Sequence, residues 1–288
     1  MVESHIISLN QRIKRKPSRI FRQITSKIRL LPSFIIFGAP RCGTTSLYNY
    51  LSEHPAIVPA LSKEIGFFEL NFQHGINWYK LFFPTIFSKY QIKKELRNEI
   101  ITGEATANYI HHPRVPARIK KHLPNIKLIL LLRNPVDRSY SQYYKLVKLG
   151  REKLSFKEAL KIEPERIRGE TEKMIQNDNY YSLNYHNFSY LTAGIYVDRL
   201  ELWFKSFPKD QILILRSEDL YENPELIYKQ TLEFLELSNF KLSSYNRFNY
   251  YNDQPKMDNT IRQKLIDYYK PHNQRLYKLL NRDFNWDK

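Results

Sequence analysis

The sequence predicts an α/β fold in three layers, in which helices cover both faces of a central, mainly parallel sheet. Short and mostly apolar segments recur along the chain, as is typical of parallel strands that are buried on both faces. Segments with the start signals of helices lie between them. In such folds ligands bind beyond the carboxyl ends of the strands, so functional residues are expected there.

Each element has its own local signal. Strands are expected at Phe34–Phe37, Glu99–Thr102, Ile126–Leu132 and Gln211–Leu215. Proline and capping residues mark the helices. A helix over Thr45–Glu53 ends at His54-Pro55, and Asn134-Pro135 starts a helix that stops at Gly150. Ser155 and Glu158 form a capping box, Asn223-Pro224 starts a helix through Leu237, and Asp258 starts one toward Tyr269. No repeat or break in composition divides residues 32–288, which we expect to form one domain behind an extension over residues 1–31.

The composition is that of a folded enzyme. Apolar residues make up 42% of the 288 residues, enough for a sizeable core. The single cysteine, Cys42, excludes an internal disulfide and offers no spacing typical of a metal site, so we expect no metal. No apolar run approaches the roughly 18 to 20 residues of a transmembrane helix, and the first 30 residues lack the core of a signal peptide. A cytoplasmic location is therefore expected.

The net charge of +17 is unevenly distributed. Residues 1–31 carry eight Lys and Arg against Glu3 alone, and Ile20, Ile24 and Ile28 recur every four residues, which predicts a short basic amphipathic helix. Two interpretations stay open: residues 12–30 bind the inner face of a membrane peripherally, or the isoleucines pack on the domain. The rest of the positive charge suits acidic ligands, but no nucleic-acid recognition motif is present.

The most informative motif is the loop between the first strand and the first helix. Backbone N–H groups of such a loop point at one spot, and the helix dipole adds about half a positive charge there. The spacing from Gly38 to Gly43 is that of a phosphate loop, which predicts a P-loop-like fold. Thr44, however, stands where a nucleoside-triphosphatase carries lysine, and Arg133 ends the next apolar strand where such an enzyme needs an acidic residue. A kinase or hydrolase is therefore disfavoured.

A second anion site is predicted where the strand Ile126–Leu132 ends. Arg133 leaves the strand as the next helix begins, and Ser141 lies about two turns into that helix. A guanidinium and a hydroxyl beside a helix start can hold a phosphate. Alternatively, Arg133 pairs with a structural carboxylate and Ser141 is a surface residue. Together with the loop, the pair predicts a ligand that is phosphorylated twice.

Glu64 is the candidate general base. It lies among apolar and aromatic residues, a setting that raises the pKa of a carboxylate and suits proton removal from an acceptor hydroxyl. The alternative is a structural salt-bridge partner.

With these three features in order, the chain resembles the sulfotransferases that use 3′-phosphoadenosine-5′-phosphosulfate (PAPS), especially the heparan sulfate sulfotransferases and their bacterial relatives. The resemblance runs from about Pro32 to the C-terminus. Residues 38–46 match the 5′-phosphosulfate loop, and residues 132–141 match the 3′-phosphate site. Weaker matches follow in order: Lys63-Glu64 with Phe67-Phe68, Trp78-Tyr79, Gly103-Glu104-Ala105-Thr106 with Tyr109, Gly194-Ile195-Tyr196, Trp203 with Phe207-Pro208, and Pro271-His272-Asn273.

The resemblance implies transfer of a sulfuryl group from PAPS to a hydroxyl, with a glycan or glycoconjugate as acceptor and a small-molecule alcohol or amine as the alternative. It implies that Glu64 is the base and that Arg41 replaces the catalytic lysine of the loop, where a cation offsets charge on the leaving phosphate. The residues implied to bind the donor are Arg41, Cys42, Gly43, Thr44, Thr45, Ser46, Arg133, Ser141 and Tyr196. A non-catalytic binder of polyanions or membranes is supported by the charge alone.

The chain departs from the family pattern in the acceptor region. Gly66 stands where a histidine is usual, Ala105 replaces a second lysine, and the disulfide-closed loop over the donor is reduced to residues 250–256, in which Lys256 has no assigned role. An aromatic and polar segment either contacts the acceptor or forms a surface loop; its residues are Tyr180, Tyr181, Tyr185, His186 and Tyr190.

Overall fold

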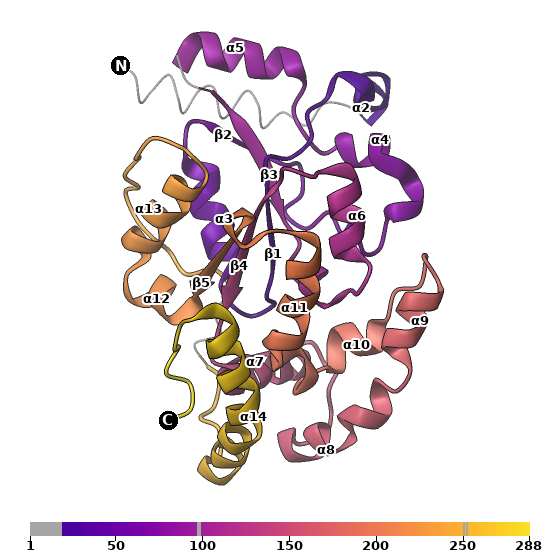
Figure 1. The fold of residues 1–288 in the computed structure, drawn as a ribbon, viewed down its shortest axis with the longest axis vertical. Coiled ribbons are helices and arrows are strands. Elements are labelled where there is room, and N and C mark those ends of the chain that lie inside the picture. Colours follow the sequence, from indigo (N-terminus) through magenta and orange to yellow (C-terminus); the bar gives the residue numbers. More distant parts are fainter. Residues whose placement is uncertain (1–18, 97–98, 250, 252) are drawn as a thin grey trace.

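The structure is a computed structural model, which describes residues 19–96, 99–249, 251 and 253–288. Its centre is a parallel five-stranded sheet with the strand order β2-β3-β1-β4-β5 (Figure 1). The strands are β1 (Phe34–Gly38), β2 (Ile57–Pro59), β3 (Ile101–Ala105), β4 (Lys127–Leu132) and β5 (Ile212–Arg216). The predicted α/β fold is confirmed.

Three of the four expected strands lie within one residue of their predicted bounds, while β3 begins two residues late. Glu99 is exposed before the strand, and Ile101 is the first residue to pair, opposite Ile57 of β2. β2 was not predicted, because three residues are too few to show a strand pattern. β1 lies in the middle of the sheet, and its residues from Phe34 to Phe37 are fully buried.

Helices cover both faces of the sheet. In Figure 1, α3 and α13 lie on one side and α6 and α11 on the other, with α7 and α14 near the lower end of the strands. The helices are α2 (Arg19–Ile24), α3 (Thr44–Glu53), α4 (Gly75–Lys80), α5 (Ile86–Leu96), α6 (Val115–His122), α7 (Pro135–Lys148), α8 (Phe156–Arg166), α9 (Glu170–Gln176), α10 (Leu183–Phe188), α11 (Tyr196–Ser206), α12 (Ser217–Glu222), α13 (Pro224–Phe234) and α14 (Asn259–Leu280).

The capping signals act as the sequence predicts. The side chain of Asn134 accepts a hydrogen bond from the Val136 amide at 3.0 Å, and Ser155 and Glu158 form both bonds of the capping box. The last helix is longer than expected, because α14 continues through Pro271 to Leu280. A proline inside a helix costs about 3 kcal/mol. Burial of side chains on both sides of Pro271, including Leu276, offsets that cost.

The N-terminal helix α2 turns its isoleucines to the solvent and an arginine toward the domain. Ile20 and Ile24 are 69% and 78% exposed, whereas Arg22 and Arg29 are buried. Arg22 donates to the carbonyl of Leu81, and Arg29 donates to that of Phe83 at 2.6 Å, so backbone oxygens hold the arginines inward. The interpretation that the isoleucines pack on the domain is therefore wrong. The arm before Arg19 lies outside the described residues, none of whose helices is long and apolar enough to cross a membrane.

Candidate active site

The candidate site lies where the connections from neighbouring strands diverge. β1 pairs with β3 on one side and with β4 on the other, so the carboxyl ends of three parallel strands meet there. The loop after β1 enters α3 through Gly43, whose φ of 88° is in the left-handed region. A Cβ at this position would stand 2.9 Å from Leu220 Cδ2, so only glycine fits. The N-terminus of α3 opens onto the loop and favours an anion.

The structure brings Arg41, Arg133 and Ser141 together. The Nε of Arg41 donates to the Ser141 hydroxyl at 3.0 Å, and an Nη of Arg133 donates to the Arg41 carbonyl at 3.2 Å. The Arg41 guanidinium also lies 5.2 Å from the centre of the Tyr251 ring. Burial, together with the neighbouring charge of Arg133, lowers the pKa of Arg41, but an arginine stays charged. The residues of the two predicted anion sites therefore lie next to one another.

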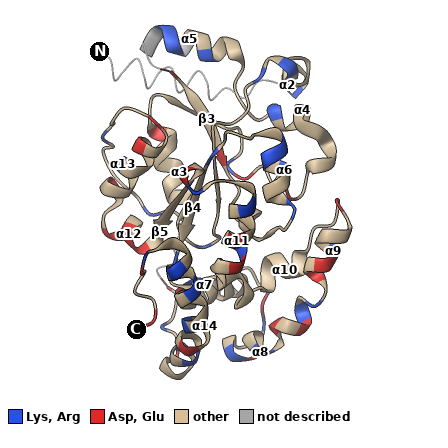
Figure 2. Cartoon of the chain, viewed as in Figure 1, with Lys and Arg blue, Asp and Glu red and all other residues tan. Residues whose placement is uncertain are grey.

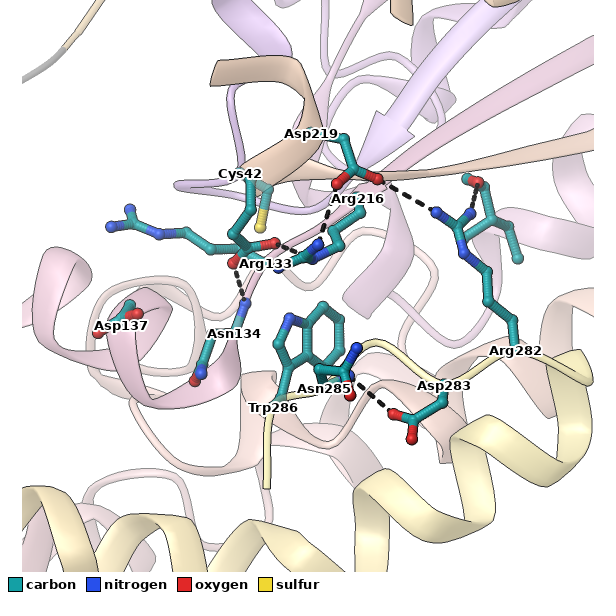
Figure 3. A network of polar contacts seen from close by, with 12 residues as sticks. Cys42, Arg133, Asn134, Asp137, Arg216, Asp219, Arg282, Asp283, Asn285 and Trp286 are labelled. Atoms are coloured by element: carbon teal, nitrogen blue, oxygen red, sulfur yellow. Dashed lines mark hydrogen bonds and ion pairs between the residues drawn. The ribbon is translucent and has the colours of Figure 1, made fainter. Parts of the chain in front are cut away.

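A charged network fixes the start of α7, on which the second anion site depends. The amide of Asn134 donates to Glu218 of α12 at 2.8 Å, and Glu218 pairs with Arg216 at 3.3 Å. Arg216 also binds Asp219, which in turn pairs with Arg282 near the C-terminus (Figure 3). This network was not predicted, because Asn134 and Glu218 are 84 residues apart.

Lys63 connects the candidate base to the loop. Its Nζ donates to the hydroxyl of Thr45 at 2.7 Å and pairs with the carboxylate of Glu64 at 2.9 Å. The Glu64 side chain is 55% exposed and is therefore open to solvent. The backbone amide of Ala105, at the end of β3, donates to the Lys63 carbonyl at 3.0 Å. Lys63 was not among the predicted site residues, and its position next to Glu64 was the signal available.

The apolar surroundings that we expected for Glu64 belong to two other carboxylates. Glu69 and Glu104 are buried, and burial raises the pKa of each above its usual range, with their mutual repulsion adding to the effect at Glu69. Glu104 accepts hydrogen bonds from the hydroxyls of Tyr79 at 2.6 Å, Tyr109 at 3.0 Å and Thr106 at 2.5 Å. Glu104 is thus held in the interior by three hydroxyl groups. The apolar environment predicted for Glu64 was wrong, since its side chain is 55% exposed.

Polar residues from several segments surround His186 of α10, and the charge of Glu64 acts on them. His186 Nδ1 is 2.5 Å from the Tyr181 hydroxyl, and its Nε2 is 3.5 Å from the amide nitrogen of Asn108. Burial, with the charge of Lys145, lowers the pKa of His186 to about 4, so its ring is neutral at pH 7. Lys145 follows Ser141 by one turn of α7, and burial beside Arg41 lowers its pKa.

The aromatic segment therefore divides into two parts. Tyr181 and His186 lie where the charge of Glu64 acts on both. The hydroxyls of Tyr180 and Tyr190 instead donate to Glu170 and Glu152 at 2.7 and 2.8 Å, and Tyr185 is buried against Arg199. These three tyrosines serve the fold.

The remaining predicted donor residues line the loop or support it. Cys42 is fully buried, and the Tyr196 hydroxyl lies 3.9 Å from its sulfur while donating to the Arg133 carbonyl at 2.8 Å. These two side chains therefore support the loop from behind. Thr44 and Ser46 are also buried, which leaves their backbone at the start of α3.

A C-terminal segment crosses the loop helix. The amide of Phe248 donates to the Ser46 hydroxyl at 3.1 Å, and the side-chain amide of Asn249 donates to Thr45 at 3.1 Å. Lys256, further along, is exposed. Gly66, the departure next to Glu64, has a φ of 63°, and its amide donates to the Thr106 hydroxyl at 3.2 Å, which fixes the backbone after the base.

Comparison with known proteins decides the family. A family model described as the sulfotransferase domain matches residues 31–275. The chain belongs to the sulfotransferase family. The resemblance inferred from the sequence motifs is thereby confirmed, and the match covers all five strands of the sheet.

Similar proteins include sulfotransferases from distant organisms. The membrane-associated sulfotransferase kil1 of Dictyostelium discoideum is 31% identical over 98% of this chain and 72% of its own length. The mouse heparan sulfate glucosamine 3-O-sulfotransferase 3B1 is 26% identical over 89% of this chain, which spans 65% of that enzyme. Among solved structures, a sulfotransferase from Alicyclobacillus acidocaldarius superimposes with a TM-score of 0.67 at 29% identity, over 90% of this chain and all of that one. This sulfotransferase thus shares its fold with a bacterial enzyme over most of the chain.

Proposed function

We propose that this sulfotransferase moves a sulfuryl group from PAPS to a hydroxyl of a glycan or glycoconjugate. The observation that carries the proposal is a pair of hydrogen bonds, from Lys63 to Thr45 and from Arg41 to Ser141. Lys63 joins the Glu64 carboxylate to the loop helix through Thr45, and Arg41 joins the same loop to Ser141 on α7. A base for the acceptor and cations for two anionic groups of one donor therefore share one site.

The reaction needs one proton transfer and one displacement at sulfur. The acceptor oxygen attacks the sulfur, its proton passes to Glu64, and the bond between sulfur and the 5′-phosphate oxygen breaks with its electron pair on that oxygen. Arg41 and Lys63 offset the charge that grows on the departing phosphate, and Arg133 with Ser141 holds the 3′-phosphate. Ser141 and Arg41 are partners in the structure, so donor binding exchanges that contact for contacts to the phosphates.

Two observations support a glycan acceptor. Tyr181, His186, Asn108 and Lys145 place several hydrogen-bonding groups near a half-exposed base, which suits a hydroxyl-rich ligand better than an apolar one. In addition, several relatives are named for the sulfation of heparan sulfate glucosamine.

A screen of acceptors with labelled PAPS tests the proposal. Glycans with free hydroxyls, simple alcohols and amines are compared at equal concentration, and the products are identified by mass. We expect sulfation of glycan hydroxyls to dominate. Sulfation of simple alcohols or amines alone would reject the acceptor class, whereas failure with PAPS on every acceptor, despite binding of the nucleotide, would reject the function.

A further inference from the structure

The end of the domain opposite the active site carries exposed apolar side chains on two helices. In Figure 1, α2 and α5 lie together at the upper end, while the loop after β1 lies toward the lower end. Ile20 and Ile24 of α2 and Ile86 of α5 are exposed, and Phe87 and Tyr90 of α5 are 66% and 71% exposed. These five residues are called the α2–α5 surface below. Large exposed apolar side chains on two helices at the same end of the molecule are typical of a contact with another body.

Buried arginines impose this orientation on α2. Arg22 and Arg29 donate to the carbonyls of Leu81 and Phe83, so the two guanidinium groups lie against the connection that leads into α5. Residues 29 and 30 then run along that connection, since the amide of Leu30 donates to the Pro84 carbonyl at 2.9 Å. The two helices are therefore joined at their bases. The isoleucines face outward because the arginines face inward.

The charges around this surface are mostly positive. Arg19, Lys27 and Lys94 are exposed, residues 19–31 contain no Asp or Glu, and the sequence of α5 contains Glu95 against Lys89, Lys93 and Lys94 (Figure 2). Glu99 is paired with Lys89 and Lys93. The chain that precedes Arg19 adds four Lys and Arg against Glu3. An apolar patch surrounded by cations matches the interface of an anionic bilayer, where apolar groups insert between acyl chains and cations meet the headgroups.

We propose that the α2–α5 surface binds the domain peripherally to an anionic lipid bilayer. A water-facing role does not account for five exposed apolar side chains, and a polyanion such as a free glycan would use the cations but not the apolar groups. Docking through this end directs the carboxyl ends of the strands away from the lipid. The active site then opens to the aqueous phase while the domain stays at the membrane.

Sedimentation of the full chain with lipid vesicles tests the proposal. We expect binding to vesicles of phosphatidylcholine with about one third phosphatidylserine to be at least about 10-fold tighter than to phosphatidylcholine alone, and to weaken with salt. The variant I24S/F87S should lose about 10-fold or more of this affinity. The matched control is L226S, which removes an exposed leucine from α13 on another face.

A second variant separates charge from fold. K27E/K94E changes two exposed cations of the patch, and we expect it to abolish the preference for anionic vesicles with an unchanged melting temperature. Equal binding by wild type and both double variants would overturn the proposal. Absence of vesicle binding would overturn it as well. If the protein then forms a concentration-dependent dimer that I24S/F87S abolishes, the α2–α5 surface binds a second copy of the chain. If it forms no dimer, the chain covers this surface itself. Nucleotide binding should be unchanged throughout.

Discussion

Arg41 donates its Nε proton to the hydroxyl of Ser141 at 3.0 Å, which links the loop after β1 to the second turn of α7. The resemblance to the family implies that these residues bind different phosphate groups of the donor. Their contact means that the loop after β1 and the helix after β4 are joined, with the cation of the loop as the resting partner of the serine.

The first prediction concerns the donor nucleotide. We expect 3′-phosphoadenosine-5′-phosphate to bind and raise the melting temperature, and adenosine 5′-phosphate to bind at least about 10-fold more weakly, because charged hydrogen bonds contribute about 1.5 to 3 kcal/mol each. R133A should remove most of that difference. Calorimetry measures both affinities. Equal affinity of the wild type for the two nucleotides would remove the proposed role of Arg133 and Ser141.

Arg41 is expected to act mainly in the transition state. R41A should lower kcat by about 100-fold or more, with a smaller effect on nucleotide affinity, because its charge is needed most as the phosphate departs. R41K should retain much of the activity. The control is S141A, which removes the resting partner of Arg41 and should weaken nucleotide binding more than turnover. A loss of affinity in R41A that accounts for its whole loss of kcat/KM would make Arg41 a binding residue only.

Glu64 is expected to be the base. E64Q keeps the shape and the contact with Lys63 but removes the basic oxygen, so turnover should fall by about 100- to 10,000-fold with little change in melting temperature. The exposed ion pair of Glu236 with Lys127 offers a matched control, E236Q. Kinetics and thermal unfolding on the same samples decide the matter: reduced stability with normal activity per folded molecule would identify a structural carboxylate.

Glu69 predicts a dependence of stability on pH. Burial raises its folded pKa to about 8, so the folded state binds the proton more tightly than the unfolded chain, in which the carboxyl has its ordinary pKa of about 4.5. This contribution to stability is complete below the unfolded pKa and is lost as the pH rises through about 8. E69Q should flatten the change in unfolding free energy between these limits, by an amount on the order of a few kcal/mol. E53Q, at the exposed end of α3, is the control. A slope of equal size in E69Q would show that other groups cause it.

Local patterns explain which parts of the fold the sequence predicts. Caps at Asn134 and Ser155 act within three residues of their helix starts, and β1 and β4 are unbroken apolar runs, so each is visible in a short window. The two anion motifs are likewise contiguous. Their positions needed no knowledge of the rest of the chain.

Long-range contacts explain what the sequence analysis missed. Arg22 is buried because of a carbonyl 59 residues away, which no helical periodicity can indicate. Lys63 reaches Thr45 across 18 residues, and Glu218 reaches Asn134 across 84. The prediction for the environment of Glu64 was wrong for a related reason. Its apolar neighbours in the sequence fold into the interior and surround Glu69 and Glu104 instead.

The hydrogen bonds from Phe248 and Asn249 to the first turn of α3 span 202 and 204 residues. The first turn of α3, where we propose that the donor binds, is therefore held by a distant part of the chain. During synthesis, the loop emerges from the ribosome early, but the segment that crosses it follows only when most of the chain has been made. The growing polypeptide thus lacks these two hydrogen bonds at the first turn of α3 until translation is nearly finished.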